Sequence, residues 1–290
     1  MANYILFTDS CADLPLKLYE ELDIRVIPLS FLLEGKTYQN RPDESSMKFS
    51  EVYARLRNGA NITTSAVNVE EFKETFLPSL KEGKDILYMS FSSGLSGTYN
   101  AGRIAAEELM EEFPGRTIRI VDTLGAALGQ GLHVYLTAKK MKEGASLEEA
   151  AAFAEEIKLQ VVHWFTVDDL FFLKRGGRLS GATALVGSAL GIKPILHVDN
   201  EGHLIKVSTA RGRKNSLKSL AEKMAQTVVD PQNQTVFIGH GDCLEDAQYL
   251  AQLVKDTCGV KEVIIDYVGP VIGAHSGPGT MALFYIGRER

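Results

Sequence analysis

Short apolar runs alternate with stretches of helical periodicity over the first half of the chain. The runs that we assign to strands are 5–7, 25–33, 86–91 and 117–121. Apolar residues from Val69 to Leu80 recur at helical spacing, and Asn68 before them is a favourable N-cap. Strands that alternate with helices predict βαβ units on a mainly parallel, Rossmann-like sheet.

The pattern changes near residue 158. Ser146 and Glu149 form a capping box that predicts the start of a helix, and this helix runs to about Lys158. Beyond it, the runs 195–198 and 203–207 flank an Asp-Asn-Glu-Gly turn and predict a β-hairpin. Further strands are predicted at 161–167, 235–239 and 263–268, with helices at 217–228 and up to residue 254. We therefore predict an N-terminal α/β domain over residues 1–157 and a second over 158–290, with a ligand site between them.

Composition and charge narrow the possible classes of protein. The 290 residues are 45% hydrophobic and carry a net charge of -6, which argues against a broad basic face for nucleic acid. The apolar runs at 24–33 and 183–196 are interrupted well short of the roughly 20 residues that span a bilayer. The N-terminus resembles a first strand and not a signal peptide. We expect a cytoplasmic protein without integral membrane association.

Cysteine and histidine give no sign of a metal. Cys11, Cys243 and Cys258 are widely spaced, so we expect free thiols and neither a disulfide framework nor a zinc site. The six histidines show no metal-ligand spacing within one helix. The prediction is a protein with no metal and no cofactor.

The loop Ser92-Ser93-Gly94-Leu95-Ser96-Gly97-Thr98 carries the most informative chemistry. It lies between a predicted strand and a helix beginning near Thr98, whose free backbone N–H groups would face the loop and suit an anion. Ser93 and Ser96 add hydroxyl donors, and Gly97 allows close approach of the backbone. The loop has no Walker lysine and lacks the glycine spacing of a nucleophile elbow. Its alternative interpretation is a plain N-cap turn.

Three other segments carry polar or charged candidates. Thr64 and Ser65 precede the helix at Val69, where hydroxyls more often serve as caps. Residues 269–280 predict a rigid, turn-rich loop that carries His275. Basic residues cluster at 174–178 and 211–214, and the guanidinium groups that suit a phosphate or an acidic partner are Arg175, Arg178 and Arg211, although most such clusters are solvated surface.

Together these segments resemble the DegV family, bacterial fatty-acid-binding proteins that include the binding subunits of fatty acid kinase. The motifs that carry the resemblance span nearly the whole chain: Thr8-Asp9-Ser10, Thr64-Ser65, Ser93 to Thr98, Val121-Asp122, Leu-Lys-Arg-Gly-Gly-Arg-Leu-Ser at 173–180, Gly-Ile-Lys-Pro at 191–194, Arg211, and His275 before Gly277-Pro278-Gly279.

The resemblance implies a two-domain DegV-like fold with the acyl chain in a tunnel and the carboxylate near the domain interface. Thr64 and Ser96 match the carboxylate-binding residues, with His275 close by. Ser65, Ser93 and Gly97 belong to the same motifs, and we expect them to bind the fatty acid as well. In kinase systems a family member presents its fatty acid to a separate kinase that makes the acyl phosphate for phospholipid metabolism. The residue matching Arg211 is associated with that step. A chain such as palmitate is the expected ligand, and no catalytic residue is expected here.

One departure from the family pattern concerns the segment after Thr64 and Ser65. The family commonly continues with Gln-Pro, whereas this chain has Ala66 and Val67. The contacts of that glutamine are therefore missing. The candidates for tunnel lining, each equally suited to an ordinary core position, are Phe31, Leu32, Phe171, Phe172, Leu190 and Ile195.

Two other functions remain open from the residues. A serine hydrolase or acyltransferase would use Ser96 and His275 with Asp9 or Asp122, because triads assemble in space and not in sequence. A phosphosugar or nucleotide binder would explain the anion loop, but it needs no long apolar cavity. Fold alone does not choose among them.

Overall fold

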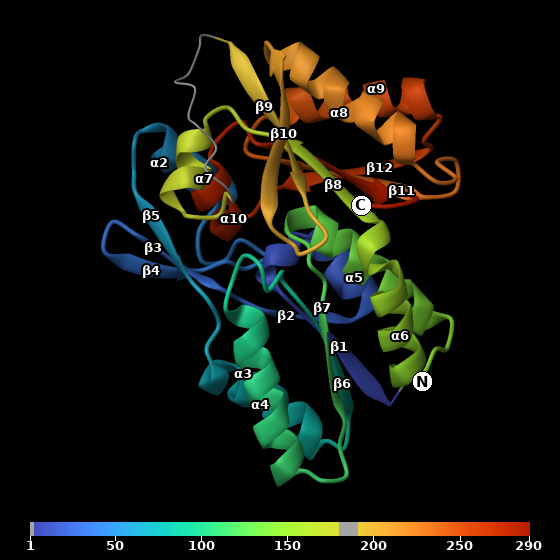
Figure 1. The fold of residues 1–290 in the computed structure, drawn as a ribbon. Helices are drawn as coiled ribbons and strands as arrows, with labels where there is room; N and C mark the ends of the chain where they lie inside the picture. Colours follow the sequence, from blue (N-terminus) through green and yellow to red (C-terminus); the bar gives the residue numbers. More distant parts are fainter. Residues whose placement is uncertain (1–2, 180–190) are drawn as a thin grey trace.

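The computed structural model describes residues 3–179 and 191–290, whose strands form three sheets (Figure 1). The motif residue Ser180, the tunnel candidate Leu190 and most of the apolar run at 183–196 lie outside these residues. The first sheet is parallel, in the order β2-β1-β6-β7. Its strands are β1 (Tyr4–Asp9), β2 (Ile24–Ile27), β6 (Asp85–Ser90) and β7 (Ile118–Asp122).

Helices cover both faces of this sheet, as the βαβ pattern predicts. They are α1 (Leu16–Leu22), α3 (Val69–Lys81), α4 (Thr98–Glu112), α5 (Ala127–Lys142) and α6 (Leu147–Ile157), with a short 3-10 turn η1 (Ser10–Ala12) after β1. Asn68 and Ser146 each accept a hydrogen bond from the backbone three residues on, and each belongs to a full capping box. The predicted helix starts are thereby confirmed.

The second sheet is mixed and holds six strands in the order β10-β9-β8-β13-β11-β12. They are β8 (Val161–Thr166), β9 (Ile192–Val198), β10 (Leu204–Arg211), β11 (Thr235–His240), β12 (Glu262–Tyr267) and β13 (Met281–Ile286). The hairpin predicted around the Asp-Asn-Glu-Gly turn is confirmed as the antiparallel pair β9 and β10. A 3-10 turn η2 (Lys158–Gln160) and the helices α7 (Leu170–Arg175), α8 (Arg213–Thr227), α9 (Leu244–Cys258) and α10 (Pro270–Ser276) complete this half.

The predicted single strand at 25–33 is wrong, because the segment divides at Pro28 into two strands of different sheets. β2 ends at Ile27 and pairs with β1, whereas β3 (Ser30–Leu33) is the centre of a small antiparallel sheet. The partners of β3 are β4 (Lys36–Gln39) and β5 (Ile62–Ser65), and α2 (Phe49–Arg57) lies between them in sequence. Proline has no N–H to continue a ladder, which suits the break.

The predicted turn-rich loop at 269–280 is also partly wrong, since Pro270–Ser276 forms the helix α10. Pro270 occupies the first helical turn, where its missing N–H costs nothing, and Val271 and Ala274 are buried. Gly277 ends the helix at a φ of +81°. Tertiary packing therefore favours a helix in a segment whose glycines and prolines are typical of turns.

A large apolar core joins the two halves of the chain. The larger cluster of buried side chains includes Phe7 and Tyr88 from the first sheet together with Phe165 and Phe284 from the second. Helix α5 packs against β8, β11 and β13 and lies between the two large sheets (Figure 1). A second cluster lies under α8 and α9. The described residues contain no helix long and apolar enough to cross a membrane. The boundary at residue 158 stays a prediction.

Candidate functional site

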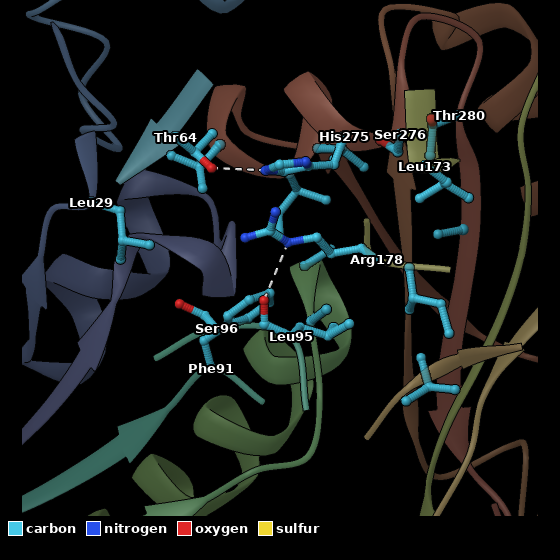
Figure 2. Close-up of a pocket in the computed structure, with 18 of the residues that line it drawn as sticks. Leu29, Thr64, Phe91, Leu95, Ser96, Leu173, Arg178, His275, Ser276 and Thr280 are labelled. Carbon is cyan, nitrogen blue, oxygen red and sulfur yellow. Dashed lines mark hydrogen bonds between the residues drawn. The ribbon is translucent and has the colours of Figure 1, made fainter. Parts of the chain in front are cut away.

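A pocket of about 150 Å³ lies where the three sheets approach one another (Figure 2). Its walls come from β5, the loop after β6, the start of α5, β8, α7, the β9–β10 hairpin, α10 and β13. Most of the side chains that line it are apolar: Leu29, Ala66, Phe91, Leu95, Ala126, Ala127, Phe165, Leu173, Val198, Leu204, Val268, Val271, Ile272, Ala282 and Phe284. The remaining residues are Thr64, Ser65, Ser96, Gly97, His163, Arg178, His275, Ser276 and Thr280.

Polar groups from three distant segments meet in the pocket. The hydroxyl Oγ1 of Thr64 on β5 is 2.7 Å from Nε2 of His275 on α10, across 211 positions of sequence. Arg178 donates from Nε to the carbonyl oxygen of Leu95 at 3.4 Å, and Figure 2 shows its guanidinium between His275 and Ser96 in that view. Thr64, Ser96 and His275, which were proposed together, therefore share one pocket.

The imidazole of His275 is neutral at ordinary pH. Burial, together with the smaller effect of the positive charges of Arg178 and Arg175, lowers the pKa of His275 to about 4. Nδ1 has no hydrogen-bond partner in the part of the chain that the structure describes. A Cβ at Gly176 would lie 2.2 Å from Nδ1, so only glycine allows α7 to pack this closely on the ring.

The loop after β6 leads into α4 at the predicted position, but only some of its serine side chains line the pocket. Helix α4 begins at Thr98, whose backbone N–H donates to Oγ of Ser96 at 3.2 Å. Ser96 and Gly97 line the pocket. Ser93 is exposed, donates its backbone N–H to Asp122 at 3.2 Å and does not line the pocket. Ser92 ties the loop to the hairpin by donating to the carbonyl of Gly202 at 2.9 Å.

The basic candidates are separated by the fold. Arg178 lines the pocket, whereas Arg175 is exposed with its guanidinium 5.1 Å from the ring centre of Phe172. Arg211 is exposed at the end of β10 and lies outside the pocket lining. A direct contact between Arg211 and a pocket ligand therefore has no support in this arrangement, and its surface position suits contact with a partner.

The tunnel candidates that fall within the described residues do not line the pocket. Phe31 and Ile195 are fully buried core residues, while Leu32 and Phe171 are 44% and 55% exposed. Phe172 also lies outside the lining, and Leu190 is outside the described residues.

The aromatic wall consists instead of one phenylalanine at the end of β6 and two on strands of the second sheet, namely Phe91, Phe165 and Phe284. Phe284 packs edge-on against His163, with ring centres 5.2 Å apart. In the sequence these three phenylalanines stand out only because each lies in an apolar run. Such a run does not distinguish a pocket wall from a core.

The hydrogen bonds of a catalytic triad are missing among the described residues. Asp9 is buried and accepts from the hydroxyl of Tyr88 at 2.9 Å and the N–H of Phe91 at 2.8 Å. Asp122 accepts the backbone N–H of Ser93, in the loop after β6, and that of Leu124. Neither carboxylate is bonded to His275, and Oγ of Ser96 is paired with Thr98 at 2.9 Å. A serine nucleophile would need a base within hydrogen-bond reach, and Ser96 has none here.

Similarity to known proteins matches this architecture over the whole chain. The sequence model of the DegV family, described as uncharacterised proteins, matches residues 4–288. The chain belongs to the DegV family. A DegV domain-containing protein of Clostridium perfringens is 46% identical over 287 residues, which cover 99% of this chain and 98% of that protein. The DegV family recognised from the motifs is thereby confirmed.

Solved structures of DegV proteins share the fold at full length. A DegV lipid-binding protein from Thermotoga maritima superposes with a TM-score of 0.87 at 30% identity, with 100% of both chains covered. A DegV family protein from Thermus thermophilus, described for its fatty acid binding, gives a TM-score of 0.84 at 33% identity and covers 98% of this chain and 99% of its own. The predicted α/β DegV-like fold is confirmed.

Proposed function

We propose that this protein binds a long-chain fatty acid in the pocket between its sheets, with the carboxylate near Thr64, Ser96 and His275. The observation that carries the proposal is one pocket that combines an extensive apolar wall with a small set of hydroxyl, imidazole and guanidinium groups. That combination suits an amphipathic ligand with one anionic end. The fatty acid binding described for the Thermus thermophilus relative supports the same ligand class.

The apolar wall accounts for affinity. Burying an acyl tail gains roughly 0.8 kcal/mol per methylene, on the order of 10 kcal/mol for a sixteen-carbon chain before ordering costs. The pocket is about ten times larger than the space that one water molecule needs, and its apolar lining offers few partners to water. A long alkyl chain is therefore the occupant that fits this wall best.

The polar end accounts for orientation. Because the imidazole of His275 is neutral, it carries a single N–H. In the tautomer with this proton on Nε2, His275 donates to Thr64 and leaves the threonine hydroxyl free to donate to a ligand oxygen. Arg178 supplies positive charge beside it. A buried carboxylate needs several such donors to offset the loss of its hydration.

We further propose that the protein acts in the cytoplasm and presents its fatty acid to a separate kinase that forms the acyl phosphate. Two observations favour a carrier over an enzyme: the sequence has no Walker lysine, and the hydroxyl of Ser96 is hydrogen-bonded to Thr98 and not to a general base. The exposed position of Arg211 suits contact with a second protein. Arg178 and Arg175 are the candidates for meeting the added phosphate.

Mass spectrometry of lipid extracted from the purified protein tests the proposal. We expect a fatty acid of about 14 to 18 carbons, and added fatty acid should raise the melting temperature of delipidated protein. A delipidated protein that shows no thermal shift with any long-chain fatty acid would refute lipid binding. Covalent labelling of Ser96 by a serine-directed phosphonate, together with esterase activity of the protein alone, would favour the hydrolase instead.

A further inference from the structure

A second cavity, of about 290 Å³, shares no lining residue with the lipid pocket. It is bounded by η1, α1, the segment between β4 and α2, and the end of β12. Four of the residues that line it carry a carboxyl group and three carry an aromatic ring: Asp13, Asp43, Glu44, Asp266, Tyr19, Phe49 and Tyr267.

The carboxyl groups of this cavity lack a cationic partner. No lysine or arginine lines it, and none of the four acidic side chains takes part in an ion pair within residues 3–179 and 191–290. Arg41, whose charge acts on Asp43, is hydrogen-bonded through its side chain to Gln39. The cavity therefore gathers carboxyl groups that form no ion pair with a basic side chain of the described residues.

Asp13 gives this cavity an unpaired acceptor. Its side chain is only 9% exposed, and Oδ2 has no hydrogen-bond partner among the described residues. The backbone at Asp13 is held in the left-handed region at a φ of 51°, directly after η1. Burial, then the negative charges of Asp266 and Asp9, raise the pKa of Asp13 although the backbone N–H of Gly269 opposes them. A buried, unpaired carboxyl oxygen is unfavourable unless a proton or a cation meets it.

The aromatic rings indicate which kind of cation fits. Phe49 and Tyr267 meet edge to face with ring centres 6.2 Å apart, and Tyr19 is buried on α1. Ring faces attract ammonium and guanidinium groups, whereas hard metal ions prefer several oxygen ligands. Among the described residues, no group of three or more histidine, cysteine, aspartate or glutamate side chains is placed to hold a metal ion. The chemistry of the lining thus favours an organic cation.

We propose that this cavity binds an alkylammonium or guanidinium group, held by Asp13 and Asp266 beside the rings of Tyr19, Phe49 and Tyr267. Such a group belongs either to a free small amine or to a lysine or arginine side chain of a partner protein. Both sources present the same chemistry to the cavity, and the experiment separates them.

Isothermal titration calorimetry of the full-length, lipid-loaded protein tests the site with two probes. Agmatine represents a free small cation, and the peptide acetyl-Gly-Arg-Gly-amide represents a partner side chain. We expect at least one probe to bind the wild type, and we expect Asp13→Asn to weaken it about tenfold or more, because the substitution removes the charge and the second carboxylate oxygen. Asparagine tolerates the left-handed backbone and keeps the oxygen that faces Gly269.

Two controls make the outcome decisive. Glu74→Gln removes one negative charge from the exposed face of α3 and should change the affinity less than about twofold. Asp266→Asn tests the same site and leaves Asp13, with its left-handed backbone, unchanged. Binding of agmatine identifies a free small cation, and binding of the peptide alone identifies a partner side chain.

The proposal is overturned if neither probe binds at up to about 10 mM, if Asp13→Asn and Asp266→Asn both bind like the wild type, or if Glu74→Gln weakens binding as much as they do. Displacement of the probe by magnesium chloride but not by sodium chloride of equal ionic strength would also overturn it, in favour of a metal ion. Fatty acid content measured on the same samples keeps this result separate from the lipid pocket, with which the cavity shares no residue.

Discussion

Replacing Thr64 by valine removes the hydroxyl at the centre of the proposed head-group site and keeps the branched shape of the side chain. Thr64 lies on β5, where a β-branched residue suits the strand, so the sheet should tolerate the change. The neighbouring Thr63→Val is a matched control, because adjacent side chains of a strand point to opposite faces and Thr63 is exposed outside the pocket.

The size of the effect follows from what the hydroxyl touches. A hydrogen bond to a carboxylate contributes roughly 1.5 to 3 kcal/mol, so Thr64→Val should raise the dissociation constant for palmitate roughly 10- to 150-fold. The same change leaves Nε2 of His275 without its 2.7 Å partner, and this lowers the free energy of unfolding by roughly 1 to 3 kcal/mol. Binding must therefore be measured at a temperature where both variants are folded.

Isothermal titration calorimetry suits this measurement because it needs no optical reporter, whereas the single tryptophan, Trp164, packs against the second core cluster on the face of β8 opposite Phe165. Circular dichroism at the same temperature checks that the variant is folded. If folded Thr64→Val binds palmitate as tightly as Thr63→Val and wild type, the carboxylate does not meet Thr64 and the head-group site lies elsewhere.

Three further predictions concern other parts of the molecule. Arg211→Ala should retain bound fatty acid but lower acyl phosphate formation with a cognate kinase; loss of lipid with full turnover per bound lipid would contradict this. Burial lowers the pKa of His133 to about 3, so the folded state excludes a proton that the unfolded chain accepts below about pH 6.5. In urea titrations, wild type should therefore lose stability relative to His133→Gln as the pH falls from 6.5 to 4. An equal change in the free energy of unfolding of both proteins over this range would disprove the prediction. Arg290 donates to the backbone carbonyls of Leu124, Lys158, Val161 and Asp199, so Arg290→Ala should lower the free energy of unfolding by roughly 1 to 3 kcal/mol, whereas Arg288→Ala should not.

Local signals in the sequence predict the elements that depend on a few neighbouring residues. The caps at Asn68 and Ser146 are satisfied by groups three positions away, and the hairpin between β9 and β10 is closed by its own turn. Helix α4 begins at Thr98, as the position of the serine and glycine loop implies. Each of these features is determined by residues that are close together in the sequence.

Features that depend on tertiary contacts could not be derived from local pattern. Helix α10 forms because Val271 and Ala274 are buried, and nothing in the spacing of its glycines and prolines indicates this. The pairing of β2 and β3 with different sheets also depends on tertiary contacts, although Pro28 between them is a local signal that the strand is interrupted. Local pattern identifies an apolar run without revealing whether it faces a core or a pocket.

In the candidate site, too, some features follow from local sequence and others depend on tertiary contacts. The residue types of Thr64, Ser96 and His275 suit a carboxylate, but only the resemblance to a known family indicated that they act together. The contact of Thr64 with His275 joins β5 to α10 across most of the chain, which no periodicity encodes. Ser93 and Arg211 belong to the same motifs and yet lie outside the pocket. A motif therefore identified the family correctly without deciding which of its side chains face the ligand.

The position of β13 has a consequence for how the chain reaches its native state. β13 follows every other strand in sequence, yet it lies in the interior of the six-stranded sheet and joins β8 to β11. Until residues 281–286 leave the ribosome, β8 and β11 each expose an unpaired edge, and such edges favour association with other chains. Completion of this sheet therefore waits for its last strand, and a nascent chain stalled before Met281 would be a substrate for chaperones or proteases although it already contains β8 and β11.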